Sequence, residues 1–464
     1  MSIQKETNYY TRTFDEIEDR LDFVFYHPNL DKIKKFRKSG KTISFGKVVD
    51  PESIDYGITA SGTEEGTVLF VNTQNITYDG TINIEDMKYL SNVEEKFLLK
   101  EGDIIITRSR RVGVAAIVQK ELDNATFGSY IIRFRLKSGV RYLERFVVNY
   151  INSEEGQEQI TLLKTGSTGA NINSQQLLDI QLPNIDIGYQ KKIIGESYPL
   201  IEEAQKLELE YLQEYKRIDG LLFEQLGITL PQEKNFTYFC DFSDDERLSF
   251  GVYHPDNKEL IKSLKLAKYP TKIIIDVINP KYESLEPSKT NKNDYFTYVG
   301  LENVESNTGK VKDIVKMKGS DIESKSNVFK KGQLMFGKLR PYLNKIFILE
   351  DADAAIGSAE FFVSEAKENI FLPFVKYYLL SEATLRQTKW ILSGASYPRL
   401  DEYDFLKIKI VIPEEENEQK RIVALVEKER KRIERINLKS IEKRENYKSV
   451  FKQMLHQSLE TINI

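Results

Sequence analysis

The residues whose types could support catalysis stand in incomplete motifs. Gly40-Lys41-Thr42 ends like a phosphate-binding loop, but Lys35 stands where that loop needs its first glycine, so the cradle of backbone amides is missing. An adenine methyltransferase needs an Asn/Asp-Pro-Pro-aromatic loop to hold the flipped base. Asn279-Pro280-Lys281 and Asp50-Pro51-Glu52 lack the second proline and the aromatic residue of that loop. We therefore expect no catalytic site on this chain.

The other possible metal or acid–base motifs are also incomplete. Glu323-Ser324-Lys325 and Glu365-Ala366-Lys367 lack the aspartate partner of a metal-dependent nuclease. His27 and His254 stand in equivalent Tyr-His-Pro sequences with no serine or cysteine nucleophile in register, which favours a structural cap over catalysis. With three scattered histidines and one cysteine, Cys240, we expect no bound metal.

Clustered basic residues point instead to nucleic acid. Lysine and arginine suit phosphates, while arginine, asparagine and glutamine can address base edges. Basic clusters lie at 32–47, at 108–111 after a predicted strand, at 133–145 and at 338–340. Each could equally be a solvated loop, and the stretch 165–173 is either a simple turn or a phosphate contact. The candidate DNA-binding residues are Lys34, Lys35, Arg37, Lys38, Arg108, Arg110, Arg111, Thr168, Asn171, Asn173, Lys338, Arg340, Tyr342, Asn344, Lys389, Ser396 and Arg399.

Composition limits this interpretation. The chain has 464 residues, 40% apolar and 30% charged, which is typical of a globular protein and, at roughly 150 residues per domain, predicts two to four domains. Its net charge of −4 lacks the basic excess of most nucleic-acid-binding proteins, so any DNA contact must be local. The sequence has no apolar run near the roughly 20 residues of a membrane span and no signal-like N-terminus. We expect a soluble cytoplasmic protein.

The elements that must position these residues occur twice. Five sequence blocks recur in the same order, separated by 227 to 230 positions. The paired blocks begin at Arg20 and Arg247, Val71 and Val299, Lys100 and Lys330, Thr165 and Ser393, and Gln190 and Gln419. Chance does not preserve order and offset over half a chain, so the sequence is a tandem duplication.

Each half has the same predicted order of elements. Short strands come first, at 68–71, 104–107 and 130–136 in one half and at 272–276, 333–336 and 345–349 in the other. A helix follows near 142–163 and near 370–390, and Pro183 and Pro413 come before the last element of each half. The predicted fold class is α+β.

A long helix closes each half. Apolar residues recur along both helices at about 3.5-residue spacing, which indicates a helical partner. Residues 186–226 hold 5 basic and 9 acidic residues and residues 414–457 hold 12 and 9, so opposite charges favour pairing of the two helices with each other. Each would be a rod of roughly 60 Å. The residues assigned to the coiled coil and to subunit docking are Ile194, Ile201, Tyr211, Ile218, Leu222, Ile422, Val426, Ile433, Ile436 and Tyr447.

Over nearly its whole length the chain resembles the specificity (S) subunit of type I restriction–modification systems. The resemblance rests on 165–173, Leu177, Ile180, Pro183 and Gln190-Lys191-Lys192-Ile193, and on their counterparts 393–396, Leu400, Leu406, Ile408, Pro413 and Gln419-Lys420-Arg421-Ile422. It implies two pseudo-repeated mixed αβ target-recognition domains, 1–185 and 227–413, joined by two long antiparallel helices, 186–226 and 414–464.

The resemblance also implies a function. In that family each recognition domain binds half of a bipartite asymmetric DNA sequence, and the helices set the distance between the halves and dock two modification (methyltransferase) subunits. Those subunits methylate adenine with S-adenosylmethionine, and ATP- and Mg²⁺-dependent restriction subunits cleave unmodified DNA in phage defence. The chain itself would be non-catalytic and bind no cofactor.

Three alternatives stay open. The chain could be a coiled-coil adaptor that joins proteins, the specificity subunit of a related restriction or phage-defence system, or an enzyme with its own methylation activity. Enrichment of a bipartite motif from random duplexes would favour DNA reading over the adaptor. Methyl transfer by the purified chain alone would favour the enzyme.

Overall fold

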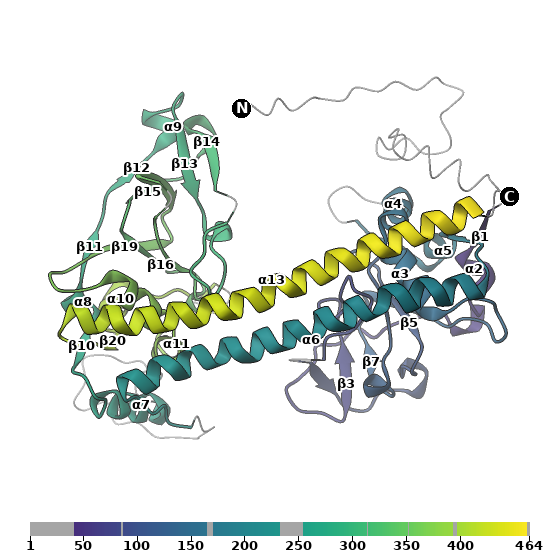
Figure 1. Cartoon of the computed structure of the whole chain (residues 1–464), viewed down its shortest axis with the longest axis horizontal. Coiled ribbons are helices and arrows are strands. Elements are labelled where there is room, and N and C mark those ends of the chain that lie inside the picture. The colour runs from purple at the N-terminus through teal and green to yellow at the C-terminus, as the bar shows by residue number, and fades with distance from the viewer. Residues whose placement is uncertain are drawn as a thin grey trace. The chain divides into compact units, whose positions relative to one another are not determined.

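A computed structural model of the chain describes residues 41–84, 87–164, 170–232, 254–312, 314–350, 352–392 and 397–461. The chain divides into unit 1, Met1–Glu208 with Leu438–Ile464, and unit 2, Leu209–Asn437. Helices α6 (Ile187–Leu226) and α13 (Glu416–Thr461) each contribute one end to each unit (Figure 1). Each unit is therefore a mixed αβ domain together with the ends of both long helices.

Unit 1 contains a central four-stranded sheet of order β2 (Asp55–Tyr56), β8 (Ile131–Phe134), β5 (Ile104–Thr107) and β6 (Ala115–Ile117). Along β5, Ile104 and Ile106 pack in one core and Ile105 in another, so the run of isoleucines reflects a strand that is buried on both faces. The second core also involves the sheet of β4 (Lys88–Leu90), β3 (Val68–Val71) and β7 (Thr126–Phe127), in which β3 and β7 are parallel.

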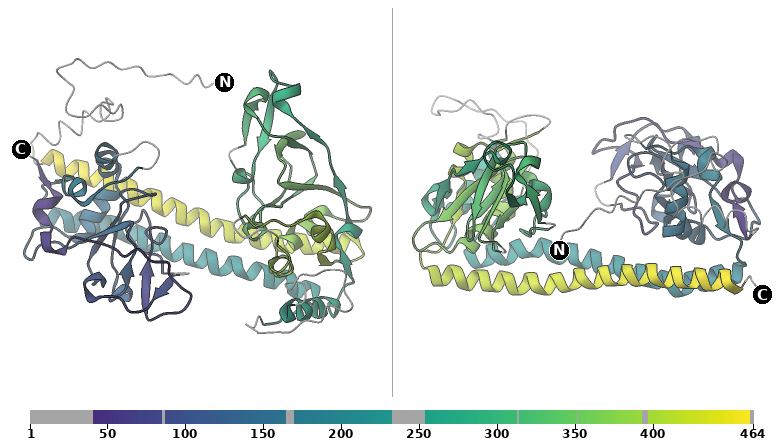
Figure 2. Two further views of the ribbon diagram at one scale, coloured as in Figure 1. Left: turned by 180° about the vertical axis from the view of Figure 1, so that it is seen from behind. Right: turned by 90° about the horizontal axis from the view of Figure 1, so that it is seen from above.

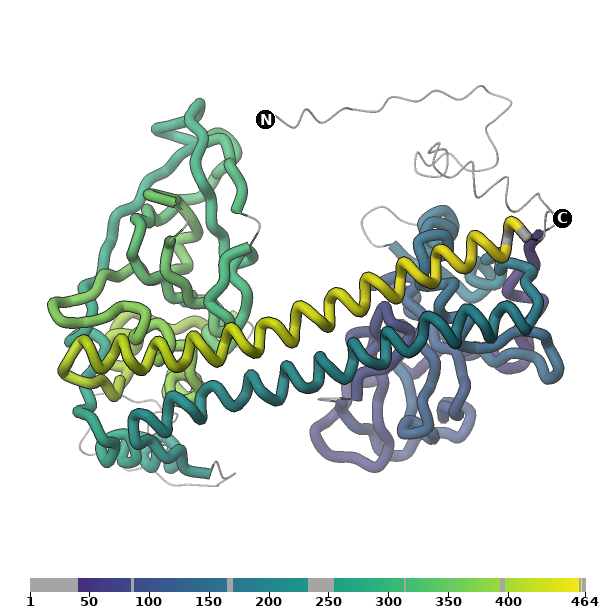
Figure 3. Tube along the Cα trace, in the orientation of Figure 1, coloured from purple at the N-terminus to yellow at the C-terminus, as the bar shows by residue number. Residues whose placement is uncertain are grey.

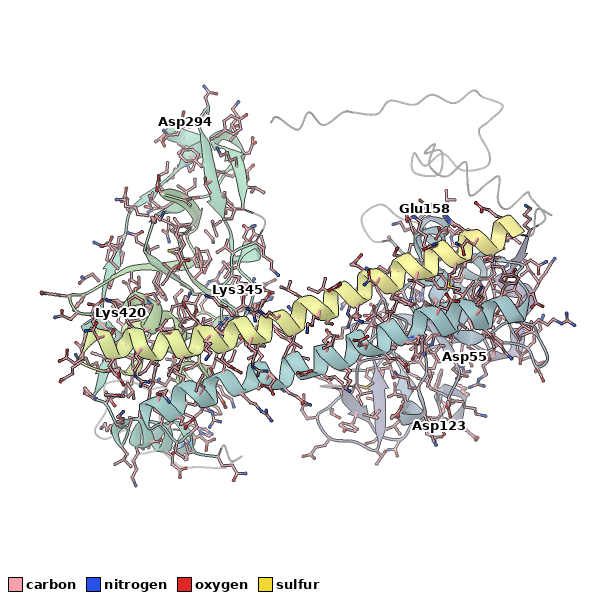
Figure 4. The ribbon with its side chains drawn as sticks, in the orientation of Figure 1. Asp55, Asp123, Glu158, Asp294, Lys345 and Lys420 are labelled. Carbon is pink, nitrogen blue, oxygen red and sulfur yellow. The ribbon has the colours of Figure 1, made fainter. Side chains whose placement is uncertain are left out.

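Unit 2 repeats this plan. Its four-stranded sheet has the order β11 (Ile278–Lys281), β19 (Phe361–Ala366), β16 (Leu334–Gly337) and β17 (Ile346–Ile348). A five-stranded sheet follows the order β12 (Ser284–Leu285), β15 (Ser326–Lys330), β18 (Ala354–Ser358), β13 (Tyr295–Val299) and β14 (Val315–Lys318), with β13 and β18 parallel. The strands of this unit lie to one side of the helices (Figure 2), and Asp294 marks the end of the five-stranded sheet farthest from them (Figure 4).

A two-stranded sheet closes each domain: β1 (Thr42–Ser44) with β9 (Gln181–Pro183), and β10 (Thr271–Ile273) with β20 (Lys409–Val411). A buried glutamine supports the closing strand in both units. Gln159 accepts a hydrogen bond from Gln181 N (2.8 Å) and donates to its carbonyl (3.1 Å), and Gln387 does the same at Lys409 (2.8 and 2.9 Å). The duplication therefore extends to individual hydrogen bonds.

The structure corrects three predicted elements. The helix expected at 142–163 is two helices, α3 (Glu144–Asn152) and α4 (Glu154–Leu163), and that at 370–390 is α10 (Leu372–Leu379) and α11 (Glu382–Lys389). Ser153 and Ser381 lie at the breaks, where each hydroxyl donates to a backbone carbonyl at 2.7 Å and so competes with the helical bonds. The strand expected at 272–276 ends at Ile273, because the short helix α8 begins at Ile274. The other α-helices among the described residues are α2 (Phe45–Val48), α5 (Ser174–Leu178), α7 (Pro255–Lys265), α8 (Ile274–Val277), α9 (Pro287–Thr290) and α12 (Glu402–Lys407).

The two long helices lie side by side within each unit (Figure 3). In unit 2, Arg421 of α13 donates to Gln225 of α6 at 2.9 Å and Arg432 pairs with Glu214. In unit 1, Lys443 pairs with Glu203 at 2.7 Å. The partner of Lys443 comes earlier in α6 than the partner of Arg432, so the two helices are antiparallel. The predicted fold class is confirmed. None of the helices in the described ranges is both long and apolar enough to cross a membrane.

Candidate nucleic-acid interface

The predicted basic residues after β5 and β16 form equivalent turns, which we call basic turn 1 (residues 108–111) and basic turn 2 (residues 338–340). The backbone N–H of Arg108 donates to Tyr130 O at 2.8 Å, and the Arg108 carbonyl accepts from Ile172 N at 3.0 Å. Lys338 makes the equivalent pair of bonds, to Glu360 O at 2.7 Å and from Leu400 N at 3.0 Å. Both turns are thus attached to the rest of their domain by the same backbone contacts.

Each basic turn contains an arginine with left-handed backbone. Arg110 has φ +63° and Arg340 has φ +49°. Every other non-glycine residue with positive φ in the described ranges is an asparagine, a residue type that tolerates this region. A long side chain does not, and Pro341 further restricts Arg340 because a residue before proline favours extended backbone. Such strain, of order 1 kcal/mol or more per residue, is typical of functional sites.

Exposed tyrosines lie under the cations. The guanidinium of Arg110 lies 5.6 Å from the ring of Tyr130 and that of Arg340 5.1 Å from Tyr397. The two tyrosines are 50% and 60% exposed. Arginine over an aromatic ring keeps its planar group of donors oriented and available, and aromatic rings provide stacking surfaces for bases. The Nε atoms of Arg108 and Arg340 are buried without a hydrogen-bond partner among the described residues.

A polar cavity borders each basic turn. The cavity beside basic turn 1 has a volume of about 410 Å³, and Arg110, Tyr130, Asn72 and Gln74 are among its lining residues. Beside basic turn 2 a cavity of about 290 Å³ is lined by lysines that include Lys338, with Tyr282 and Asn327. Amides, hydroxyls and cations are the groups that distinguish base edges.

Other candidates near the basic turns have structural partners. Lys338 is half-buried, donates to Ala359 O at 2.9 Å and lies 4.7 Å over the Phe362 ring, and burial lowers the pKa of its ammonium group. Arg111 donates to Ile76 O at 2.9 Å. Tyr342, by contrast, is exposed: 53% of its surface is accessible. The side chain of Asn344 is only 2% exposed, and its amide donates a hydrogen bond to Leu380 O at 2.6 Å. Against expectation, this side chain therefore cannot reach a base.

The remaining candidates are spread over both units. Asn171 forms a backbone bridge with Ser109, and Asn173 caps α5, where its side chain accepts from Gln176 N at 2.8 Å. The cap gives the end of the 165–173 stretch a structural role. Lys389 is exposed, 4.9 Å over Trp390, and Arg399 pairs with Glu360 at 2.9 Å. Lys34, Lys35, Arg37, Lys38, Thr168 and Ser396 lie outside the described residues.

The basic cluster at 133–145 is partly structural, contrary to the prediction. Arg133 is 3% exposed, pairs with Asp55 (labelled in Figure 4) and donates to the carbonyls of Lys96 and Leu98 at 2.9 and 3.1 Å. Arg135 pairs with buried Asp103 at 2.5 Å. A buried charge needs such partners, and here they supply the explanation for the arginines.

The structure also gives His254 its predicted role as a cap. Its Nδ1 accepts from Asp256 N at 3.2 Å at the start of α7, and its ring stacks on Trp390 with centroids 3.8 Å apart. His27 lies outside the described residues. Within the described ranges, no group of three histidine, cysteine, aspartate or glutamate residues is placed to hold a metal ion.

Sequence reasoning missed the tyrosines. Tyr56, Tyr130 and Tyr397 each lie under a cation of a basic turn, with Arg108 over Tyr56 at 4.9 Å. Tyr130 is two residues before Ile132, which pairs with Ile106 of β5, so the strand register brings it to the turn. The sequence contains 25 tyrosines, and their number alone does not mark which of them lie beside a basic turn.

No protein-family model matches the sequence, and no curated protein matches it either. Solved structures are similar to the chain. A type I restriction–modification S subunit from M. genitalium covers 89% of this chain and 95% of its own, with 14% identity and a TM-score of 0.42. A structure described as the structural basis of complex assembly and conformational transition of the type I R-M system covers 90% of this chain and 96% of its own, with 14% identity and a TM-score of 0.44. The HsdS subunit from Thermoanaerobacter tengcongensis covers 89% of this chain and 95% of its own, with 13% identity and a TM-score of 0.32.

Proposed function

We propose that this chain is the non-catalytic DNA-specificity subunit of a type I restriction–modification complex, acting in the cytoplasm on a bipartite, asymmetric duplex target. One observation carries the proposal: the two halves of a duplicated chain have, at equivalent positions, an arginine with left-handed backbone. Each arginine lies over an exposed tyrosine, and the two tyrosines come from different places in the repeat. Left-handed backbone at an arginine costs stability, and it occurs in both halves. A role in recognition would explain why both halves keep it.

The differences between the halves support an asymmetric target. Basic turn 1 has the sequence Arg-Ser-Arg-Arg, and the equivalent residues of the second half are Lys-Leu-Arg-Pro. The cavities beside the turns also have different linings, with amides beside one and several lysines beside the other. Two readers with different side chains would prefer different half-sites, because base discrimination depends on a few donors and acceptors.

The shared helices supply the spacing. A helix of 40 residues such as α6 spans about 60 Å, enough for two groove-reading units about one DNA turn, 34 Å, apart. The ten predicted coiled-coil residues are buried or half-buried, and five of them lie in the core that the helices share with the domain of unit 2. We therefore assign the ten residues to packing within the chain and not to subunit docking.

Partner subunits would dock on exposed apolar residues of the same helices. Leu438 and Ile441 of α13 are 55% and 49% exposed in unit 1, and Leu209 and Leu212 of α6 are 50% and 37% exposed in unit 2. Residues three apart lie on one helix face. We propose these pairs as contacts for the two methyltransferase subunits, which would bind S-adenosylmethionine, while restriction subunits would bind ATP and Mg²⁺.

Selection from random-sequence duplexes tests DNA reading. The full chain, with its methyltransferase subunits, is expected to enrich a bipartite motif, and its affinity is expected to fall steeply with salt. Arg110→Ala should degrade one half of the motif and Arg340→Ala the other, while Lys191→Ala, exposed on α6, should change neither. A chain that enriches no bipartite motif would be better explained as an adaptor.

A further inference from the structure

Each recognition domain contacts the long helices of its unit at two places. One lies at the start of the domain's own long helix, and the other is a loop that meets the helices farther along. We call these loops brace turn 1 (residues 77–81, between the bridged Ile76 and Ile82) and brace turn 2 (residues 305–310, between the bridged Val304 and Val311). Gly80 and Gly309 give both turns a left-handed residue, with φ +76° and +70°. A Cβ on Gly80 would lie 2.6 Å from Val148, so the path of this turn is tightly specified.

Brace turn 1 meets both helices of unit 1. Asp79, with a side chain only 8% exposed, pairs with Arg444 of α13. Gln205 of α6 donates to the hydroxyl of Thr81 at 3.2 Å. Loss of Arg444 from its place would leave the carboxylate of Asp79 buried without a counterion, so the pair favours this position of the loop on the helix.

Brace turn 2 uses the equivalent positions with different chemistry. Tyr215 of α6 donates to Asn307 O at 2.5 Å, and Lys310 pairs with Glu434 of α13 at 2.7 Å. Arg430 lies beside this turn and donates to Thr308 O at 2.5 Å and to the Tyr215 hydroxyl at 3.0 Å.

The contact positions correspond in the repeat. An offset of 229, the one that relates Gln190 to Gln419, also relates Gln205 to Glu434, Tyr215 to Arg444, Asp79 to Thr308 and Thr81 to Lys310. The bonding chemistry has changed in both contacts. One pair of positions is kept, Gln205 with Thr81 and Glu434 with Lys310, whereas Tyr215 bonds Asn307, one residue before the counterpart of Asp79. This indicates that the location of the contact matters more than its chemistry.

The spacing along the helix explains why. Each domain is attached to the start of its own helix through a buried glutamine, Gln190 or Gln419. The brace contact comes 15 residues later on that helix, about 22 Å away at 1.5 Å per residue. The domain also packs on the helices through an apolar core, which includes Phe451 and Leu455 in unit 1 and Ile422 and Val426 in unit 2. The brace adds a polar contact farther along the helix, and contacts at this separation constrain the tilt of the domain.

We propose that the brace turns are positioning elements: each holds its domain at one angle on the helices of its unit, and together they select the gap between the half-sites. The selection of a gap rests on the proposed function above. The fixed angle does not, so the two parts can be tested separately.

Distances between spin labels test the angle without DNA. Labels at Glu121→Cys and Lys439→Cys, both exposed in unit 1, are introduced with Cys240→Ser. We expect a narrow distance distribution in the parent and a broad one after Asp79→Ala. Lys443→Ala, which removes only the interhelical pair with Glu203, should leave it narrow. Asp79→Asn, which keeps the side-chain shape, replaces Asp79→Ala if that variant loses its circular dichroism signal. A distribution as narrow as the parent's in the folded variant overturns the proposal.

Selection from random duplexes tests the gap. The wild-type chain with its methyltransferase subunits should enrich one gap length. Asp79→Ala, or Tyr215→Phe with Lys310→Ala, should keep both half-site sequences, spread the gap over neighbouring lengths and weaken binding at the original gap about 3- to 10-fold. An unchanged single gap in variants with broadened label distances would overturn gap selection by the braces. Absence of any bipartite motif for the wild type would instead overturn the proposed function, whatever the label distances are.

Discussion

Gln190 and Gln419 occupy equivalent positions and make the same three hydrogen bonds. Gln190 accepts from Leu143 N at 3.0 Å and donates to the carbonyls of Arg141 and Ile185, both at 2.9 Å. Gln419 accepts from Phe371 N at 2.8 Å and donates to Asn369 O at 3.2 Å and Pro413 O at 2.9 Å. Both side chains are fully buried. The glutamine of the repeated Gln-Lys motif thus joins the start of a long helix to the chain segment that precedes α3 in unit 1 and α10 in unit 2.

Loss of this glutamine should destabilise its unit. Gln190→Ala would leave a buried N–H and two carbonyls without partners, and each unsatisfied group costs about 1–3 kcal/mol. We expect a decrease in the free energy of unfolding on the order of 2–4 kcal/mol for Gln190→Ala and for Gln419→Ala. Urea unfolding followed by circular dichroism measures it. The neighbouring exposed Lys191→Ala is the control, and equal stabilities of Gln190→Ala and Lys191→Ala would contradict the prediction.

Glycine in place of the strained arginine should separate stability from binding. Arg340→Gly relieves the left-handed backbone, so the free energy of unfolding should stay unchanged or rise by up to about 1 kcal/mol. DNA affinity should fall because the guanidinium is lost. Arg340→Ala keeps the strain and should also lose affinity. Unfolding curves and binding titrations on the same samples decide this, and a glycine variant that binds DNA normally would argue against a role for Arg340.

The apolar stripe, and not the charges, should hold the helices together. Ile433 is 1% exposed within a buried core, and its neighbour Arg432 pairs with Glu214 at the surface. We expect Ile433→Ala to cost about 2–4 kcal/mol of stability and Arg432→Ala to cost about 0–1 kcal/mol. Thermal unfolding of the two variants in parallel tests this. A larger loss for Arg432→Ala would show that the charges dominate.

Asp219 should make the stability of unit 2 depend on pH. Burial raises the pKa of its carboxyl to about 6, although the hydrogen bond from Glu382 N (2.7 Å) opposes the shift. The unfolded chain ionises Asp219 near pH 4 while the folded chain keeps the proton, so stability falls as pH rises from about 4 to 6 and is level above. At about 1.4 kcal/mol per pKa unit, the decrease over about two units is on the order of 3 kcal/mol.

Asp219→Asn removes this titration and keeps an acceptor for the backbone N–H. Relative to wild type, the variant should therefore gain unfolding free energy progressively between pH 4 and 6 and keep the gain at pH 7. Urea unfolding at each pH measures the difference, with exposed Glu224→Gln of the same helix as control. A constant difference across this range would mean that Asp219 has an ordinary pKa in the folded protein.

Much of the fold could be predicted because its signals are local or repeated. The strand at 104–107 reads as one apolar run because it is buried on both faces. The long helices were predictable because each keeps its apolar spacing over about 40 residues, even through Pro199 of α6. The breaks at Ser153 and Ser381 could not be read in this way, because a serine can lie in a helix or end one, and the partner of its hydroxyl decides.

The sequence by itself determined the duplication, the alternation of short strands with helices and the pairing of two long helices, since order, offset and apolar period are properties of the chain. Only the tertiary structure decided which polar residues are available. It buried Asn344 and Arg133 among backbone partners, placed Tyr130 and Tyr397 under arginines, and brought Asp79 to Arg444 from 365 positions away. The physical reason is that exposure and ion pairing depend on neighbours distant in sequence, which no local pattern specifies.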